Sequence, residues 1–312
     1  MFNGKIVVLM GGPSTEREVS LRTGSAICEA LLAKGCNVTG LDLDRQVVAN
    51  LLLEKPDVVF IAVHGKYGED GVVQGILDLL EIPYTGSGVL ASALAMDKAL
   101  SKKVFTASNI PTPRAMIFGP AEQRLGIVAM TDRIYSQFTL PVVVKAATQG
   151  SSIGVTIVNE KEALGVAVEA AFGYSETVVV EQYISGKEIT VAVWGNDTPQ
   201  ALPIIEIAPI SGRYDYQSKY TKGATEYIVP ARLPKDVYQA IQQTAVEAHQ
   251  ALYCKGISRV DFMVENNGDF YVLEVNTVPG MTETSLVPKA AAAQGINFGD
   301  FVLNLIELAL QK

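Results

Sequence analysis

Arg259-Val-Asp261-Phe-Met-Val264 and Tyr271-Val-Leu-Glu274-Val-Asn276 are two apolar segments separated by a short polar turn. The turn, residues 266–269, reads Asn-Asn-Gly-Asp, a composition that favours a β-hairpin. Side chains alternate between the two faces of a strand, so Glu274 and Asn276 share one face, and the hairpin brings Asp261 alongside them. The sequence therefore predicts three oxygen ligands on two paired strands.

Two carboxylates and an amide are the ligands of a hard cation that carries nucleotide phosphates, since such an ion keeps open positions for its substrate. This predicts a magnesium site at Asp261, Glu274 and Asn276. The alternative is a solvated hairpin edge. We favour the metal site because both strands are apolar, and a buried carboxylate without a partner is costly.

The composition excludes several classes of protein. A net charge of -8 and a pI near 5.0 argue against a broad nucleic-acid surface, which needs clustered Lys and Arg. No apolar run approaches the roughly 20 residues that span a bilayer, and Met1–Lys5 leads directly into a predicted strand. We therefore expect no membrane partner and a cytoplasmic location. The three cysteines show no CxxC spacing and indicate neither disulfides nor a metal site.

The first third of the chain alternates apolar strands with helices. Gly11-Gly-Pro13 forms a turn, and Thr15 and Glu18 have the spacing of a helix capping box. The predicted strands are 5–10, 37–43 and 57–63, and the predicted helices are 19–33, 72–80 and 91–105. This order predicts a parallel sheet covered on both faces, in a domain that ends near the helix carrying Lys98.

After Pro111 the pattern changes to antiparallel strands at 141–145, 155–158, 177–181 and 189–194, followed by helices at 236–253 and 298–310. Between them, residues 207–229 form a long segment rich in Tyr, Lys and Gly. Long segments of this kind are typical of lids and binding loops, so we expect a lid here.

A second ligand signal lies in Thr148-Gln-Gly150-Ser151-Ser152-Ile-Gly154, a loop between two predicted strands. Glycines and hydroxyls allow backbone amides to surround an anion, so the loop is a candidate phosphate flap. Lys145 ends the apolar strand that enters it, and a buried lysine requires an anionic ligand or an acid nearby. The alternative for Lys145 is a side chain that extends to solvent.

The chain contains no Gly-x-x-x-x-Gly-Lys-Ser/Thr motif, which argues against a P-loop ATPase. Instead, the Lys145 strand, the flap, Glu181-Gln-Tyr-Ile184, Glu188 and the hairpin resemble an ATP-grasp fold. The motifs at 11–20, 63–65, 96–98 and 276–282 are further similar to those of the D-alanine:D-alanine ligases, and the resemblance covers the whole chain in order.

The resemblance implies an α/β and α+β protein in which an N-terminal parallel-sheet domain precedes a two-part ATP-grasp fold. The implied divisions are an N-terminal substrate domain at 1–98, a central ATP-grasp subdomain at 99–185, and a C-terminal domain at 186–312 with the metal site and lid. It also implies ATP-dependent joining of two D-alanines through a D-alanyl phosphate, for peptidoglycan precursors. Its cofactors are ATP and two Mg²⁺ ions, with Mn²⁺ as a substitute, and its members are homodimers.

The resemblance also assigns roles residue by residue. Nucleotide contacts fall to Lys98, Lys145, Ser151, Ser152, Glu181, Gln182, Tyr183, Ile184 and Glu188. The first D-alanine lies near Glu16 and His64, and hydrogen bonds among Glu16, Ser151 and Tyr220 link three domains, with Lys219 next to the substrate. Arg259 and the Gly280 amide cradle the oxyanion, Ser285 and Leu286 receive the second D-alanine, and Asp261, Glu274 and Asn276 bind the metals.

Several of these residues have a simpler interpretation. Glu16 favours the positive end of a helix by itself, Arg259 can form an ion pair with Asp261 or Glu274 along the strands, and Tyr220 can be a packing aromatic. The chain also departs from the family pattern. Thr284 replaces His or Ile before Ser285, and Ala146 replaces a proline, so we expect a less rigid entry to the flap.

Three other functions remain open. A D-alanine:D-lactate ligase, or another ATP-grasp carboxylate–amine ligase, is the nearest, and Tyr220 favours an amine acceptor. A dinucleotide-binding oxidoreductase is suggested by Gly11-Gly12 with Asp42 or Asp44, although a third glycine in register is missing. A silent nucleotide-binding regulator is disfavoured by the complete set of acids, lysines and arginine.

Overall fold

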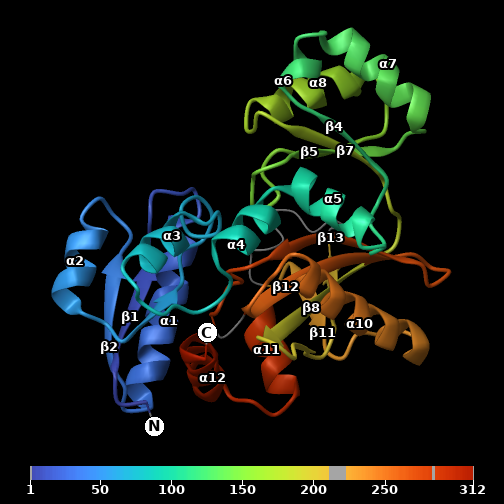
Figure 1. Ribbon diagram of the computed structural model, residues 1–312. Helices are drawn as coiled ribbons and strands as arrows, with labels where there is room; N and C mark the ends of the chain where they lie inside the picture. Colours follow the sequence, from blue (N-terminus) through green and yellow to red (C-terminus); the bar gives the residue numbers. More distant parts are fainter. Residues whose placement is uncertain (1, 211–222, 283–284, 312) are drawn as a thin grey trace.

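The computed structural model describes residues 2–210, 223–282 and 285–311. Within these residues the chain builds three β-sheets with helices packed on them (Figure 1). No described helix is both long and apolar enough to cross a membrane. The three cysteines are free thiols.

The N-terminal sheet is parallel, as predicted, with the order β2-β1-β3. Alternate residues of β1 enter two different cores, because side chains of a strand point to opposite faces. Ile6 and Val8 pack with helices α1 and α12, whereas Val7 and Leu9 pack with α2 and α3. The elements are β1 (Lys5–Met10), α1 (Arg17–Ala33), β2 (Asn37–Asp42), α2 (Val47–Glu54), β3 (Val58–Ile61), α3 (Val72–Leu79) and the C-terminal α12 (Phe298–Leu310).

The predicted capping box at Thr15 and Glu18 is wrong. Helix α1 follows Glu16, and no side chain caps it locally. Ser14 explains the difference, because its hydroxyl donates to the carbonyl of His64 at 2.7 Å and accepts the Glu16 amide at 3.1 Å. A tertiary bond to the segment after β3 thus fixes the helix start, and Glu16 faces the centre of the molecule.

The predicted helix 91–105 is also wrong, because it is two helices, α4 (Val89–Met96) and α5 (Lys98–Ala107). Asp97 between them is extended, and its carboxylate accepts the amides of Ala99 and Leu100 at 2.8 and 3.1 Å. Such N-caps satisfy helix amides that lack an internal partner. Lys98 therefore opens a helix, and its amide bonds to Ala147 at the end of the next sheet.

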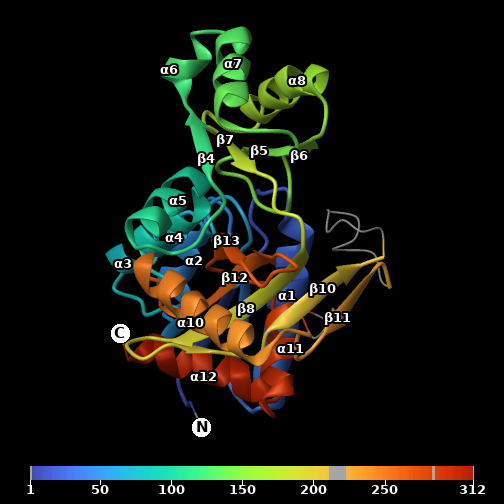
Figure 2. The same ribbon diagram turned by 90° about the vertical axis from the view of Figure 1, so that its right-hand side faces the viewer.

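The central sheet is antiparallel, as predicted, with the order β4-β7-β5-β6. Helices α7 and α8 pack on its outer face (Figures 1 and 2). Its inner face carries Val179, Lys145 and Glu181 toward α5. The elements are β4 (Ala115–Phe118), α6 (Pro120–Gln123), α7 (Ile127–Gln137), β5 (Val142–Ala146), β6 (Val155–Val158), α8 (Lys161–Phe172) and β7 (Val178–Gln182).

The third sheet has the order β11-β10-β8-β12-β13, and β9 pairs with β8. Helix α10 covers one face, and the predicted hairpin and final helix are confirmed. The elements are β8 (Lys187–Gly195), β9 (Gln200–Ala201), β10 (Ile205–Pro209), β11 (Thr225–Ile228), α10 (Lys235–Ala251), β12 (Gly256–Val264), β13 (Phe270–Asn276) and α11 (Leu286–Ala293). The predicted division of the chain after residues 98 and 185 stays a prediction.

The expectation of one long loop at 207–229 is wrong at both ends, since β10 and β11 pair as a hairpin there (Figure 2). Apolar residues such as Ile205 and Ile207 are buried and explain why these ends join the sheet. The predicted lid, with Lys219 and Tyr220, falls on residues 211–222, which lie outside the described residues.

A β-bulge divides the β12–β13 hairpin. Asp261 pairs with Glu274, but the next residue, Phe262, pairs with Val272, so Leu273 is an extra residue. An extra residue changes which side chains of a strand share a face. Phe262 and Val272 thus enter the core under α10, while Asp261 and Glu274 turn to the opposite face.

His249 provides a test of the packing under α10. It is fully buried, its Nδ1 lies 2.8 Å from Ser258 Oγ, and burial lowers its pKa to about 4. The unfolded chain therefore binds a proton between pH 6.5 and 4 that the folded protein refuses, so stability falls as the pH falls through this window. We expect protonation of this residue to lower the free energy of unfolding by about 3 kcal/mol between pH 6.5 and 4.

Urea unfolding of the His249→Asn variant at a series of pH values from 7 to 4 measures this contribution. The free energy of unfolding of the variant should fall less steeply with decreasing pH than that of the unaltered protein. If the two proteins lost free energy of unfolding equally as the pH falls, His249 would accept its proton in the folded protein as readily as in the unfolded chain.

Candidate active site

The three sheets and the start of α11 surround a cavity of about 410 Å³. Its walls contain Glu16 before α1, Lys98 at the start of α5, the flap after β5, and the end of β13. Ten residues that the sequence singled out line it: Glu16, His64, Lys98, Ser151, Arg259, Glu274, Asn276, Gly280, Ser285 and Leu286. Residues separated by up to 270 positions in the chain therefore meet in one place.

The three predicted metal ligands lie on the hairpin face that points to this cavity. Asp261 stands opposite Glu274 in the ladder, and Asn276 stands opposite Arg259. Arg259 donates to both oxygens of Asp261, at 2.9 and 2.7 Å, so the strand ion pair considered from sequence is present. The Thr190 hydroxyl also donates to Asp261, at 2.5 Å. The carboxylate is thus held in place by Arg259 of its own strand and by Thr190 of the neighbouring strand β8.

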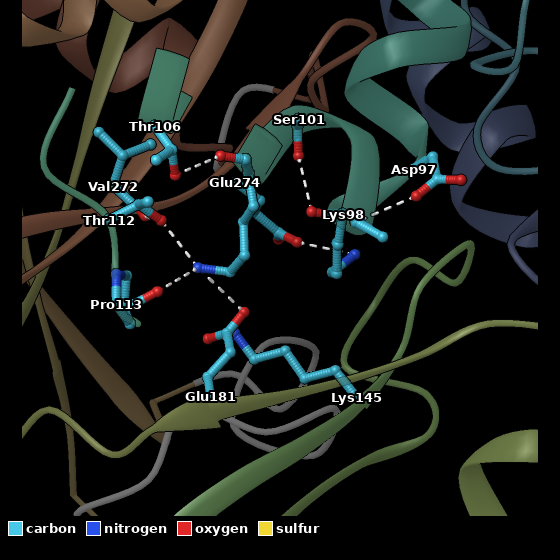
Figure 3. A network of polar contacts seen from close by, with 12 residues as sticks. Asp97, Lys98, Ser101, Thr106, Thr112, Pro113, Lys145, Glu181, Val272 and Glu274 are labelled. Atoms are coloured by element: carbon cyan, nitrogen blue, oxygen red, sulfur yellow. Dashed lines mark hydrogen bonds and ion pairs between the residues drawn. The ribbon is translucent and has the colours of Figure 1, made fainter. Parts of the chain in front are cut away.

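Lys98 joins the hairpin to the flap. Its Nζ lies 2.9 Å from Glu274 Oε2 (Figure 3). The same atom lies 2.8 Å from the carbonyl oxygen of Gln149. Burial lowers the pKa of Lys98, but the charge and hydrogen bond of Glu274 together with the charges of Glu181 and Glu69 outweigh burial, and the net pKa lies above its ordinary value. The ammonium is therefore charged at neutral pH and faces the cavity.

Lys145 has the acidic neighbour that its burial required. Its Nζ lies 2.8 Å from Glu181 Oε2, and the other oxygen of Glu181 lies 3.3 Å from Lys102 Nζ. Glu181 is 1 % exposed, and burial alone would raise its pKa. The charges of Lys145 and Lys102 outweigh that effect and lower the pKa of Glu181, so the carboxylate is ionised.

The flap contacts the N-terminal domain through Ser151, whose hydroxyl donates to Glu16 Oε1. Ser151 and Ser152 both have positive φ, at 50° and 61°, which curls the loop tightly. The less rigid entry expected at Ala146 stays a prediction. Its amide donates to the Gly154 carbonyl at 3.0 Å, a bond that proline cannot make, and it closes the stem of the flap.

His64 lies at the edge of the cavity between two polar side chains. Its Nε2 is 3.0 Å from the Thr23 hydroxyl, and its Nδ1 is 3.6 Å from Glu69 Oε1. These contacts hold the imidazole plane in a fixed orientation. The Ser285 hydroxyl, next to the start of α11, accepts the Thr282 amide at 3.1 Å.

Other predicted residues do not line the cavity: Lys145, Ser152, Glu181, Gln182, Tyr183, Ile184, Glu188 and Asp261. Of these, Lys145, Glu181 and Gln182 belong to strands of the central sheet, Glu188 and Asp261 to strands of the third sheet, Ser152 to the flap, and Tyr183 and Ile184 to the segment between β7 and β8. The Glu181 carboxylate is engaged by two lysines, and the nucleotide contact expected for this residue from the sequence stays a prediction.

Sequence reasoning missed four polar residues of the site: Arg22, Glu69, Lys102 and Thr190. Arg22 and Glu69 line the cavity, and Thr190 holds Asp261. Lys102 had a usable signal, because it follows Lys98 by four positions and such residues share a helix face. The others depend on contacts between distant segments and carry no local pattern.

The donor set fits a divalent cation. Two facing carboxylates and an amide leave most of an octahedral shell to other oxygens, as in sites where a metal bridges protein and phosphate. No group of three His, Cys, Asp or Glu side chains within the described residues forms a closed metal cage. An ion here is thus expected to share its shell with a substrate, and Lys98 next to it supplies charge for anionic groups.

Comparison with known proteins gives concordant results. Residues 104–307 match the family model "D-ala D-ala ligase C-terminus", and residues 47–87 match "D-ala D-ala ligase N-terminus". The chain is 48% identical over 309 residues to the D-alanine–D-alanine ligase of Pelotomaculum thermopropionicum, covering 99% of this chain and 97% of that protein. It is 50% identical over 307 residues to that of Moorella thermoacetica, covering 98% and 99%.

Two solved structures share the whole architecture. The D-alanine–D-alanine ligase of Bacillus anthracis complexed with ATP has a TM-score of 0.83 at 36% identity, covering 100% of this chain and 98% of that one. The VanG D-Ala:D-Ser ligase of Enterococcus faecalis has a TM-score of 0.84 at 33% identity, covering 99% and 100%. The dinucleotide-binding alternative loses its support, because Asp42 is occupied by Arg17 and the Gly12 amide.

The position of Lys98 predicts a role in binding nucleotide phosphates. The Lys98→Met variant removes the ammonium at the cavity wall, and we expect the dissociation constant of Mg²⁺·ADP to rise at least about 10-fold. Isothermal titration calorimetry at pH 7.5 measures it. Lys103→Met, on the same helix but exposed, is the matched control and should bind as the unaltered protein does. Equal affinity in Lys98→Met would remove this residue from the binding site.

Proposed function

The chain belongs to the D-alanine–D-alanine ligase family, and we propose that the cavity between its three sheets is where it joins two D-alanines at the expense of ATP. The observation that carries this proposal is the position of Lys98, which contacts both Glu274 of the hairpin and Gln149 of the flap. The Lys98 ammonium, which we assign to phosphate binding, thus contacts both a proposed metal ligand and the proposed phosphate flap.

We assign the ATP phosphates to Lys98, Lys145 and the flap residues Ser151 and Ser152. The adenine lies along the backbone of 181–184, and Glu188 meets the ribose. Asp261, Glu274 and Asn276 hold two Mg²⁺ ions, for which Mn²⁺ is a substitute. When bound, these ions neutralise phosphate charge and orient the γ-phosphoryl group.

The D-alanine substrates occupy the remainder of the cavity. Glu16 attracts the ammonium group of the first, with His64 beside it, and Ser285 and Leu286 receive the carboxylate of the second. Lys219 and Tyr220 close the site from the lid in this proposal. The hydrogen bond from Ser151 to Glu16 supports this placement of the first D-alanine, because it links the proposed phosphate flap to the acid that we assign to the substrate ammonium.

The reaction proceeds by phosphoryl transfer followed by aminolysis. A carboxylate oxygen of the first D-alanine attacks the γ-phosphorus of ATP, which gives D-alanyl phosphate and ADP. The free amine of the second D-alanine then attacks the acyl carbon, inorganic phosphate leaves, and the amine loses a proton to form the peptide bond. Lys145, Arg259 and the Gly280 amide stabilise the negative charge that develops in these steps.

D-serine is the second candidate acceptor, because a D-Ala:D-Ser ligase shares this architecture at 33% identity. D-alanine is preferred, since the relatives at 48% and 50% identity are D-alanine–D-alanine ligases. The product is a peptidoglycan precursor, and the cytoplasm, where ATP is made, is the proposed location. The homodimer stays a prediction that size-exclusion chromatography with light scattering tests.

The proposed activity predicts ADP formation that requires D-alanine and is absent with L-alanine. A coupled assay for ADP measures it at neutral pH with Mg²⁺. Mass spectrometry of products from D-alanine with equal D-serine or D-lactate identifies the acceptor, and the dipeptide should dominate. An ester or mixed dipeptide as the main product would change the assigned acceptor, and ADP formation independent of D-alanine would refute the ligase assignment.

Arg259 offers a test of charge stabilisation. In Arg259→Met we expect kcat to fall about 10²- to 10³-fold, the scale for loss of one oxyanion donor. Arg259→Lys keeps the charge but loses the paired bonds to Asp261, so its kcat should lie between that of the unaltered protein and that of Arg259→Met. Steady-state kinetics with saturating D-alanine distinguish the variants. A near-normal kcat in Arg259→Met would show that the residue only supports Asp261.

A further inference from the structure

Lys102 is a buried cation for which the reaction described above has no role. It lies on α5, four residues after Lys98, and only 3 % of it is exposed. Its Nζ donates to the Thr112 hydroxyl at 2.7 Å and to the Pro113 carbonyl at 3.1 Å, and it lies 3.3 Å from Glu181 Oε1 (Figure 3). Burying an ammonium is costly, so three partners for one amine indicate a specific function.

The contacts of Lys102 reach both sheets that enclose the nucleotide site. Glu181 belongs to β7 of the central sheet. The Thr112 hydroxyl donates in turn to the Val272 carbonyl at 2.9 Å, and the Val272 amide donates to Pro111 at 2.8 Å, so the segment 111–113 is bonded to β13. One amine therefore links α5, the central sheet and the hairpin strand that carries Glu274.

The charge balance around Glu181 depends on Lys102. Two ammonium groups face one ionised carboxylate, which leaves a net charge of +1 in this buried cluster. Without Lys102 the charge of Lys145 would be matched fully by Glu181. A phosphate would then have to compete with that carboxylate for Lys145.

We propose that Lys102 is a positioning residue for nucleotide binding, which holds the Glu181 carboxylate so that Lys145 keeps its charge available to phosphate. This inference rests on the proposed function. Lys102 acts through Glu181 and Lys145 and does not touch the nucleotide itself. Its loss should therefore weaken nucleotide binding more than it lowers kcat at saturating ATP.

The inference also predicts a pH dependence. Burial lowers the pKa of Lys102 to about 8, with Glu181 opposing and Lys145 adding to the shift. The other charged groups next to the cluster are Lys98, whose pKa is raised, and Glu274, which pairs with Lys98. As the pH rises through 8, Lys102 loses its proton, Glu181 is left to Lys145 alone, and nucleotide affinity should fall.

The experiment measures the dissociation constant of Mg²⁺·ADP by calorimetry between pH 7 and 9. Because no D-alanine is present, titration of the acceptor amine does not enter. We expect Lys102→Met to bind about 10-fold more weakly at pH 7 with little change up to pH 9. The unaltered protein should weaken toward the Lys102→Met value over the same range, whereas Lys102→Arg, which stays charged, should bind well throughout.

Two further variants separate this role from general damage to the fold. Lys103→Met, the exposed neighbour, should match the unaltered protein at every pH. Thr112→Val removes the link to β13 but keeps the ammonium, so it should weaken binding by no more than about 3-fold and keep the pH dependence. It also serves as the test of the network if Lys102→Met does not fold.

The outcomes distinguish this inference from the proposed function. Three results would overturn the inference. They are an unaltered affinity of Lys102→Met for Mg²⁺·ADP, a flat pH profile of the affinity of the unaltered protein, and weak binding by Lys102→Arg. If Mg²⁺·ADP binds and the variants behave as expected but ADP formation does not require D-alanine, the ligase assignment fails while the role of Lys102 stands. If the unaltered protein does not bind Mg²⁺·ADP, both fail.

Discussion

Burial of opposite charges in pairs is the constraint on which this site depends. Lys98 faces Glu274, Lys145 and Lys102 face Glu181, and Arg259 faces Asp261. An ammonium or carboxylate loses several kcal/mol of hydration when buried, so each needs a partner before any ligand arrives. Two of these contacts join separate elements, since Lys98 and Lys102 on α5 pair with Glu274 of β13 and Glu181 of β7, so the pairs that make the charges tolerable also hold α5 against both antiparallel sheets.

These pairs also explain how the site can receive a nucleotide and its metals together. On the proposed function, phosphates would pair with Lys98 and Lys145, divalent ions would pair with Asp261 and Glu274, and Lys102 would keep the Glu181 carboxylate paired. Each buried charge keeps a partner of opposite sign throughout this exchange. Phosphate without metal, or metal without phosphate, would leave like charges facing each other, which favours binding of the two as one complex.

Three backbone features aim the charged groups. The bulge at Leu273 turns Glu274 toward the cavity while Val272 stays in the core. Asp97 ends one helix and caps the next, which places Lys98 at a helix start beside the flap. Ser14 fixes the entry of α1, so that Glu16 reaches Ser151. Each feature involves only a few neighbouring residues, but it places a charged side chain against a segment that is distant in the chain.

The sequence by itself determined the type of the predicted elements outside residues 207–229, the parallel and antiparallel character of the sheets, and the hairpin that carries Asp261, Glu274 and Asn276, because alternating and helical patterns record which face of each element is apolar. It also indicated that Lys145, if buried, needs an acid or an anionic ligand nearby. Tertiary structure alone decided that this acid is Glu181, that Asp97 divides a helix, that Ser14 replaces the capping box, and that β10 and β11 continue a sheet. Contacts between segments far apart in the chain leave no periodic signal in the sequence. Any acid of suitable length can neutralise a buried lysine, and the packing of the sheets and helices decides which acid lies near it.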